Sequence, residues 1–231
     1  MKKLLLNFNS KDSKKIKNPK NFLGGKGANL SEMGRMGLPV PPGFTISTKV
    51  CEIFYKDKKK LNKNLISQIK KELKLIEKDV SKKFGDLKNP LLLSVRSGAR
   101  VSMPGMMDTI LNLGLNDKTV KALSLKASNG RFAKDSYRRF IQMYGNVVMG
   151  VESYHFEELI ENYKLTKGVL LDTDLDESDW DGLIEDFKRT VREKAKKDFP
   201  QDVHEQLLGA ISAVFLSVSY THLTLPTIAI V

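Results

Sequence analysis

Residues 91–109 read Leu-Leu-Leu-Ser-Val-Arg-Ser-Gly-Ala-Arg-Val-Ser-Met-Pro-Gly-Met-Met-Asp-Thr. The first five residues are largely apolar and follow Pro90, which predicts a buried strand that ends beside Arg96. The rest is a loop with two glycines, a proline and three methionines. Because exposed loops are normally polar, so apolar and flexible a loop favours a lid that closes over a ligand. Methionines that fill a gap in the core are the open alternative.

Two positively charged positions in the sequence favour a phosphate ligand. A strand that ends at Arg96 would present a guanidinium, which can hold phosphate oxygens through two parallel hydrogen bonds. Earlier in the chain, the segment Gly24-Gly25-Lys26-Gly27 precedes a short amphipathic stretch that ends at Gly37. Glycine N–H groups, a helix N-terminus and a lysine together suit an anion. The spacing is not that of a P-loop, and a plain structural turn remains an equal alternative.

Hydrophobic spacing outlines the remaining elements. Strands are expected at residues 3–8, 44–47 and 110–113, and one long surface helix is expected from Leu61 to Phe84. Behind Asn116 the pattern is helical, with helices expected at residues 117–127, 131–149, 153–166, 179–198 and 202–215. We therefore predict an α/β (α+β) part up to about residue 113, followed by a helical part.

Bulk composition excludes several classes of protein. The 231 residues carry a net charge of +12 and are 41% hydrophobic, without an apolar run long enough to span a bilayer. No secretory leader is evident, and the single cysteine, Cys51, is expected to be a small buried residue, so we expect a cytoplasmic protein. The lysine excess fits solvated helix surfaces and lacks any nucleic-acid-binding motif, so neither nucleic acid nor membrane is expected as a partner.

Several long motifs resemble the N-terminal ATP-binding domain of the phosphoenolpyruvate-forming dikinases. The shared segments are residues 24–30 (Gly-Gly-Lys-Gly-Ala-Asn-Leu), 41–46 (Pro-Pro-Gly-Phe-Thr-Ile) and 94–99 (Ser-Val-Arg-Ser-Gly-Ala). Residues 102–117, 131–144 and 172–175 are similar to the pyruvate, phosphate dikinase branch of that family. The resemblance extends from near the N-terminus to Phe215.

The resemblance implies the first lobe of an ATP-grasp-like fold with a helical insertion, binding ATP with Mg²⁺ across its phosphates. Lys26 and Arg96 match family positions that contact those phosphates. The glycine-rich loop that covers the phosphates matches residues 102–109, and its expected ATP contacts are Ser102, Met103, Gly105, Asp108 and Thr109. No metal ligand is expected within this chain.

In the family, ATP pyrophosphorylates a histidine on a separate domain, and pyruvate and phosphate are consumed elsewhere in the enzyme. That histidine lies in a Thr-Ser-His-Ala type of motif, which does not occur here. His155, His204 and His222 are expected to be structural or surface residues, so this chain should contain no catalytic residue. We expect weak or no ATP binding by the isolated chain, and a homodimer for the full-length enzyme. The motifs begin too close to Met1 to leave room for a plastid transit peptide.

The expected domains are an ATP-grasp-like lobe at 1–113, a helical insertion at 114–200 and the start of the continuing ATP-binding domain at 201–215. Residues 216–231 contain no charged side chain, unlike the chain before them. We expect a non-native tail from a truncated or misjoined reading frame, with a buried terminal strand as the alternative.

Other interpretations remain open at this point. Phosphoenolpyruvate synthase is a relative that would differ in not requiring inorganic phosphate. A non-catalytic basic module that binds polyanions would show strongly salt-dependent binding and no response to ATP. The acidic residues Asp172, Asp174, Asp176 and Glu177 lack the glycine and final glutamate of a calcium loop, so they are expected to form a polar entry into a helix.

Overall fold

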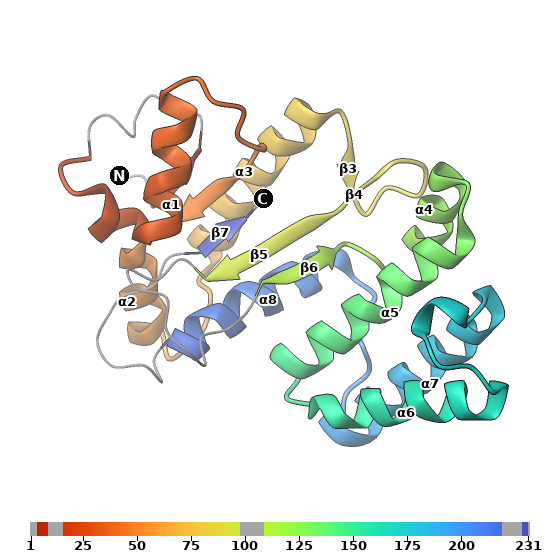
Figure 1. Cartoon of the computed structure of the whole chain (residues 1–231). Helices are drawn as coiled ribbons and strands as arrows, with labels where there is room; N and C mark the ends of the chain where they lie inside the picture. The colour runs from red at the N-terminus through yellow and green to blue at the C-terminus, as the bar shows by residue number, and fades with distance from the viewer. Residues whose placement is uncertain (1–3, 9–15, 98–108, 219–227, 231) are drawn as a thin grey trace. The chain divides into compact units, whose positions relative to one another are not determined.

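The structure is a computed structural model that describes residues 4–8, 16–97, 109–218 and 228–230 (Figure 1). Its contacts divide the chain into two compact units. Unit 1 comprises residues 1–82, 93–109 and 208–231, and unit 2 comprises residues 83–92 and 110–207. Helices predominate beside small sheets, so the α+β class is confirmed. Within the described ranges, every helix is too short or too polar to cross a membrane.

The elements of unit 1 are three helices and four short strands. They are β1 (Leu5–Asn7), α1 (Pro19–Arg35), β2 (Phe44–Ile46), α2 (Thr48–Lys56), α3 (Lys63–Val80), β5 (Leu93–Ser97) and β7 (Ile228–Ile230). Unit 2 contains β3 (Lys83–Phe84), β4 (Pro90–Leu91), β6 (Ile110–Leu113), α4 (Thr119–Ala127), α5 (Gly130–Val147), α6 (Ser153–Lys167), a 3₁₀ helix (Asp172–Asp174) and α7 (Glu177–Ala195). The last helix, α8 (Val203–Val218), begins in unit 2 and ends in unit 1.

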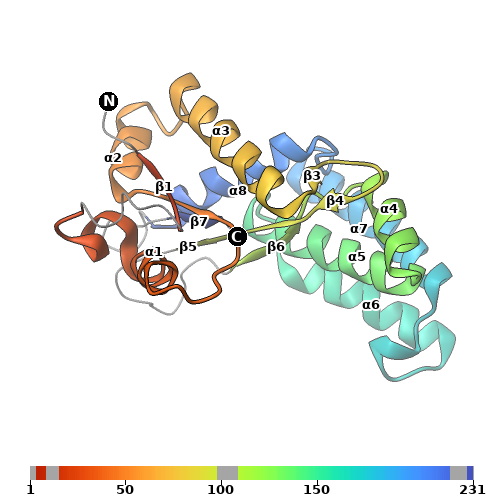
Figure 2. The same ribbon diagram turned by 90° about the horizontal axis from the view of Figure 1, so that it is seen from above.

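The strands of unit 1 pair in the order β1-β2-β7-β5, and each of these pairs is antiparallel. Side chains alternate between the two faces of a strand, so residues paired across the sheet share a face. One face therefore carries Leu6, Thr45 and Arg96, and the other carries Leu5, Ile46 and Ser97. Seen from above, α1 and α3 lie on opposite sides of these strands (Figure 2).

The second face of the sheet is part of an apolar core. Phe44, Ile46 and Val95 are completely buried, and α8 contributes Phe215, whose ring centroid lies 5.1 Å from that of Phe54. The lone cysteine belongs to the same unit: Cys51 is buried, which raises the pKa of its thiol to about 11. The prediction that Cys51 is a small buried residue is therefore confirmed.

Helix α3 matches the predicted long surface helix. Its apolar residues recur every three or four positions and are buried along one side: Leu65, Ile69, Leu73 and Ile76. The helix begins after Asn62, whose side chain accepts a hydrogen bond from the backbone N of Leu65 at 2.9 Å. It ends where Ser81 adopts a left-handed conformation with φ 53°.

The helical part predicted behind Asn116 is confirmed, since α4 to α8 lie at the five expected places. The core of unit 2 is aromatic: Trp180, Phe156 and Phe187 are completely buried, and the last two rings lie 4.9 Å apart. Trp180 is the only tryptophan in the sequence. Its fluorescence therefore reports on this core alone.

The acidic segment before α7 is a helix entry, as predicted. The Asp176 side chain caps the helix by accepting hydrogen bonds from the backbone N of Ser178 at 2.8 Å and of Asp179 at 3.1 Å. Lys167 donates to the same carboxylate, and this contact, with the Ser178 bonds, holds the pKa of Asp176 well below its ordinary value.

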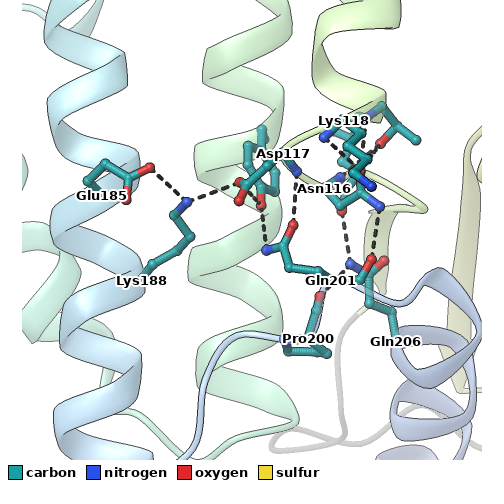
Figure 3. Close-up of polar contacts among 11 residues, drawn as sticks. Asn116, Asp117, Lys118, Glu185, Lys188, Pro200, Gln201 and Gln206 are labelled. Atoms are coloured by element: carbon teal, nitrogen blue, oxygen red, sulfur yellow. Dashed lines mark hydrogen bonds and ion pairs between the residues drawn. The ribbon is translucent and has the colours of Figure 1, made fainter. Parts of the chain in front are cut away.

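A polar network fixes the loop that leads into α4 (Figure 3). Buried Gln206 donates to the carbonyl of Leu115 at 2.9 Å and accepts from the backbone N of Gly114 at 3.1 Å. Next to it, Asp117 accepts from the hydroxyl of Tyr137 at 2.9 Å and pairs with Lys188 at 3.0 Å. The polar groups drawn there thus satisfy one another, which ties residues distant in sequence into one unit.

The structure corrects or adds to the sequence predictions at several places. The apolar run from Leu91 to Val95 is divided between β4, which pairs with β3, and β5, because the chain passes from one unit to the other at this point. A helical segment not predicted from the sequence begins at Pro19, and the expected helix follows it from Gly25 onward, after the interruption at Gly24. Helix α2 was not predicted, since Val50, Ile53 and Tyr55 have a preference for strands.

Candidate functional site: one face of the unit 1 sheet

The candidate site lies on the first face of the unit 1 sheet. Arg96 pairs with Ala229, Ala229 pairs with Thr45, and Thr45 pairs with Leu6, so these four positions form one row across the strands. Neighbouring strands are about 4.8 Å apart, which places the backbone of Arg96 about 10 Å from that of Thr45. Arg96 therefore shares its face with the residues beneath α1.

Helix α1 covers this face at the glycine cluster. Gly24 interrupts the helix with φ 70° and ψ 174°, so the helical turns resume at Gly25. A side chain at Gly27 would place its Cβ 2.8 Å from Oγ1 of Thr45 and 2.9 Å from Cγ2. Only glycine allows the helix to approach the sheet this closely. Gly27 thus has a packing role, which sequence spacing could not separate from an anion-binding role.

The glycine packing also determines where Lys26 lies. Leu23 and Ala28 of α1 are buried with Leu6 of β1, on the face that carries Arg96. Lys26 lies between these two buried positions and is exposed. The structure therefore brings the helix segment of Lys26 and the strand position of Arg96, about 70 residues apart in sequence, to one face of one sheet.

Buried polar atoms on and beneath this face have unused hydrogen-bonding capacity. Nε of Arg96, Oγ1 of Thr45 and Oγ of Ser31 are all buried without a hydrogen-bond partner among the described residues. Leaving a buried donor unpaired costs about 1–3 kcal/mol, so such groups need an explanation. A bound phosphate would supply acceptors to the guanidinium of Arg96. Ser31 lies in none of the motifs found in the sequence, and Thr45 lies in the 41–46 motif, but only the structure shows that both are buried.

The other predicted contacts lie at the edge of the described chain. Thr109 is half-buried and directly precedes β6. Ser102, Met103, Gly105 and Asp108 lie outside the described residues, so the lid that they are expected to form stays a prediction.

A cavity of about 500 Å³ lies beside α1. Its lining is mainly polar: Asn18, Pro19, Lys20, Asn21, Leu23, Ala28, Asn29, Ser31, Glu32 and Arg35. Lys26 and Arg96 are not part of this lining. The cavity is thus adjacent to the glycine cluster in sequence, yet it is not the space in front of Arg96.

A metal ion bound by protein alone requires a cluster of ligand side chains among the described residues. Within them, no group of three or more His, Cys, Asp or Glu side chains could hold a metal ion. The described histidines contact aromatic rings: His155 lies 4.0 Å from Tyr154 and His204 lies 5.7 Å from Phe84, measured between centroids.

Comparison with known proteins gives a consistent result. Residues 20–71 match the family described as pyruvate phosphate dikinase, AMP/ATP-binding domain. The chain is 52% identical over 199 residues to pyruvate, phosphate dikinase of Clostridium symbiosum, covering 86% of this chain and 23% of that protein. With the chloroplastic pyruvate, phosphate dikinase of Flaveria pringlei it shares 51% over 214 residues, 93% of this chain and 22% of that protein.

A third relative extends the same result to another bacterium. The enzyme of Rhizobium meliloti, also a pyruvate, phosphate dikinase, is 51% identical over 207 residues, covering 87% of this chain and 23% of that protein. The chain thus spans less than a quarter of the length of these curated relatives, which are phosphotransferases. It is homologous to the N-terminal nucleotide-binding region of the pyruvate, phosphate dikinases.

Proposed function

We propose that this chain provides part of the ATP site of a pyruvate, phosphate dikinase, as the first lobe of an ATP-grasp-like domain with a helical insertion. The observation that carries the proposal is the close packing of the Lys26 segment of α1 on Leu6 and Thr45, together with the buried Nε of Arg96, which has no partner among the described residues. Lysine and arginine on one face offer the charge that a triphosphate requires.

In this proposal Lys26 and Arg96 hold the phosphates, and residues 102–109 close over them. Ser102, Met103, Gly105, Asp108 and Thr109 are the proposed contacts within that loop. Phosphoryl transfer depends mainly on positioning and on neutralising the charge of the moving group, so this chain needs no nucleophile of its own. Mg²⁺ is proposed to arrive with the nucleotide and to supply further neutralisation of the phosphates.

The whole reaction would need parts beyond the matched region. We propose that ATP, pyruvate and phosphate are converted to AMP, phosphoenolpyruvate and pyrophosphate through a phosphohistidine carried by a separate domain, in a cytoplasmic homodimer. A phosphoenolpyruvate synthase would instead turn over without inorganic phosphate. Omitting phosphate from the assay of the full-length enzyme distinguishes these two activities.

Residues 216–231 are proposed to be a non-native tail, preceded by a lobe at 1–113, an insertion at 114–200 and the continuing domain at 201–215. Sequencing the gene across the codons for Phe215 and Leu216 tests this. A frame that continues into a longer dikinase coding sequence would support the proposal. A confirmed stop after Val231 would show the tail to be native and would contradict it.

Calorimetry with ATP tests the proposed roles of Lys26 and Arg96 directly. We expect saturable binding weaker than micromolar, because only part of the nucleotide site is present, and we expect Arg96→Ala or Lys26→Ala to weaken it about tenfold each. Lys20→Ala, which alters a cavity residue in the same helix, is the matched control and should bind as the unaltered chain does. A submicromolar affinity, or equal binding by all variants, would contradict the proposal.

A further inference from the structure

Helix α3 carries a second concentration of positive charge, on the opposite side of the sheet from the candidate site. A groove of about 560 Å³ lies along it, and its lining consists of Lys63, Ile66, Ser67, Lys70, Lys71 and Lys74. We call this the α3 lysine groove. All four lysines are exposed.

The spacing of the lysines gives the groove a linear shape. Lys63, Lys70 and Lys74 are separated by seven and four residues, which places them on one side of a helix with 3.6 residues per turn. At a rise of about 1.5 Å per residue, Lys63 and Lys74 are about 16 Å apart along the axis. The groove thus offers a row of charges to an extended ligand.

These charges are not neutralised within the chain. No ion pair joins any of the four lysines to a carboxylate in the described ranges, whereas Lys134, Lys164, Lys167 and Lys188 of unit 2 each contact at least one. Unit 1 contains 22 lysines and arginines against eight aspartates and glutamates, a net charge of +14. An anion in the groove would therefore gain attraction without displacing an internal partner.

The lining distinguishes between classes of anion. A protein partner would need an apolar centre, but Ile66 is the only apolar residue of the groove. Single-stranded nucleic acid is normally held by aromatic side chains on which bases stack, and the lining contains none. Lysine ammonium groups are point charges that suit phosphate oxygens without a fixed geometry. These features favour a ligand whose recognised groups are phosphates.

We propose that the α3 lysine groove binds a linear inorganic phosphate chain, at a site separate from the proposed nucleotide site. Such a ligand presents negative charge at regular intervals along its length, matching the row from Lys63 to Lys74. Binding would be electrostatic and reversible, so it should respond steeply to ionic strength. With four lysines engaged, the logarithm of the binding constant should fall with a slope of about −3 against the logarithm of salt concentration.

The test is a titration of the full chain with a short inorganic polyphosphate, followed by fluorescence anisotropy of a labelled polyphosphate chain. We expect Lys70→Glu/Lys74→Glu to weaken binding at least about tenfold and to reduce the salt slope by about half. The matched control is Lys56→Glu/Lys58→Glu, which makes the same change in charge at exposed positions outside α3. It should lower the affinity by no more than about twofold.

Three outcomes would overturn the proposal. Equal weakening by both double variants would show diffuse attraction by unit 1 rather than a groove. Tighter binding of a single-stranded RNA of equal charge would assign the groove to nucleic acid. Loss of polyphosphate binding in Arg96→Ala would place the ligand in the nucleotide site. Because Arg96→Ala is expected to affect ATP only, failure of this inference and failure of the proposed function are distinguishable.

Discussion

The two units of the chain differ in net charge and in how many of their basic side chains form ion pairs. Unit 1 has a net charge of +14, whereas unit 2 holds 17 basic and 19 acidic residues, a net charge of −2. In the described part of unit 2, eight of the 17 basic side chains lie in ion pairs, such as Lys188 with Asp117, while the lysines of the α3 lysine groove form none among the described residues. The net charge of +12 is thus a property of one unit, the unit that contains Lys26 and Arg96. Its basic character favours anionic ligands.

Both units contain buried polar atoms without a hydrogen-bond partner among the described residues, and in unit 2 these are Nε of Arg138 and Nε1 of Trp180. The Gln206 network of unit 2 is satisfied by neighbouring residues of that unit. In unit 1, Arg96, Thr45 and Ser31 each keep a buried polar atom without a partner in the described ranges. A network that satisfies itself stabilises a fold, and one with unused donors can receive a ligand. Unpaired buried atoms thus do not separate the units, and it is the net charge of unit 1 that favours it as the unit that binds an anion.

The largest expected effect concerns the independence of the two units. Phe187→Ala removes a completely buried ring from unit 2 and should lower its free energy of unfolding by about 3–5 kcal/mol. Trp180 fluorescence reports the loss in unit 2, and labelling of the buried thiol of Cys51 reports on unit 1. If the units are separately stable, the urea midpoint should fall for Trp180 and stay constant for Cys51.

The control for this experiment is Phe132→Ala, which removes a ring that is 51% exposed and should change neither midpoint much. Coincident shifts of the Trp180 and Cys51 midpoints in Phe187→Ala would show that the chain unfolds as one cooperative body. The two units would then differ in net charge but not in stability.

A smaller effect is expected at the contact between α1 and β2. Gly27→Ala would bring its Cβ to 2.8 Å from Oγ1 of Thr45, so unit 1 should lose about 1–3 kcal/mol. Thr45→Ala removes both atoms nearest to the added methyl group. The double variant should therefore recover most of the loss, as measured by urea unfolding with Cys51 labelling. Strictly additive losses would refute the packing role of Gly27.

Sequence reasoning predicted these elements unevenly. Periodicity located α3 and the helices of unit 2, because an amphipathic helix of many residues repeats its pattern several times. It joined β4 to β5, since a run of leucines does not reveal that the chain changes units at Leu92. Arg96 and Lys26 were predicted as site residues from motifs, whereas Ser31 and Thr45 were not, although Thr45 lies in the 41–46 motif. Their polarity is ordinary for their positions, and only tertiary packing makes them buried.

The smallest expected effect concerns the entry of α7. Asp176→Ala removes the helix cap together with the contact to Lys167, so it should lower the thermal midpoint reported by Trp180. Asp176→Asn keeps the cap and should lower that midpoint less. Because the folded-state pKa of Asp176 is depressed, its charge stabilises unit 2 at neutral pH, and this stabilisation is lost as the pH falls below about 4.

Comparing the two variants therefore separates the contribution of the helix cap to stability from that of the carboxylate charge of Asp176. The difference between Asp176→Asn and the unaltered chain should disappear in acid, whereas Asp176→Ala should remain less stable there. A midpoint difference for Asp176→Asn that does not change with pH would show that Lys167 contributes nothing through this carboxylate.

The most direct test of the central claim asks which unit ATP stabilises. Any ligand that binds the folded state raises its stability according to its concentration and affinity. We predict that millimolar ATP slows labelling of Cys51 and leaves the urea midpoint reported by Trp180 unchanged. In Arg96→Ala, ATP should no longer slow the labelling of Cys51. Stabilisation of the Trp180 transition alone, or undiminished protection of Cys51 in Arg96→Ala, would contradict it.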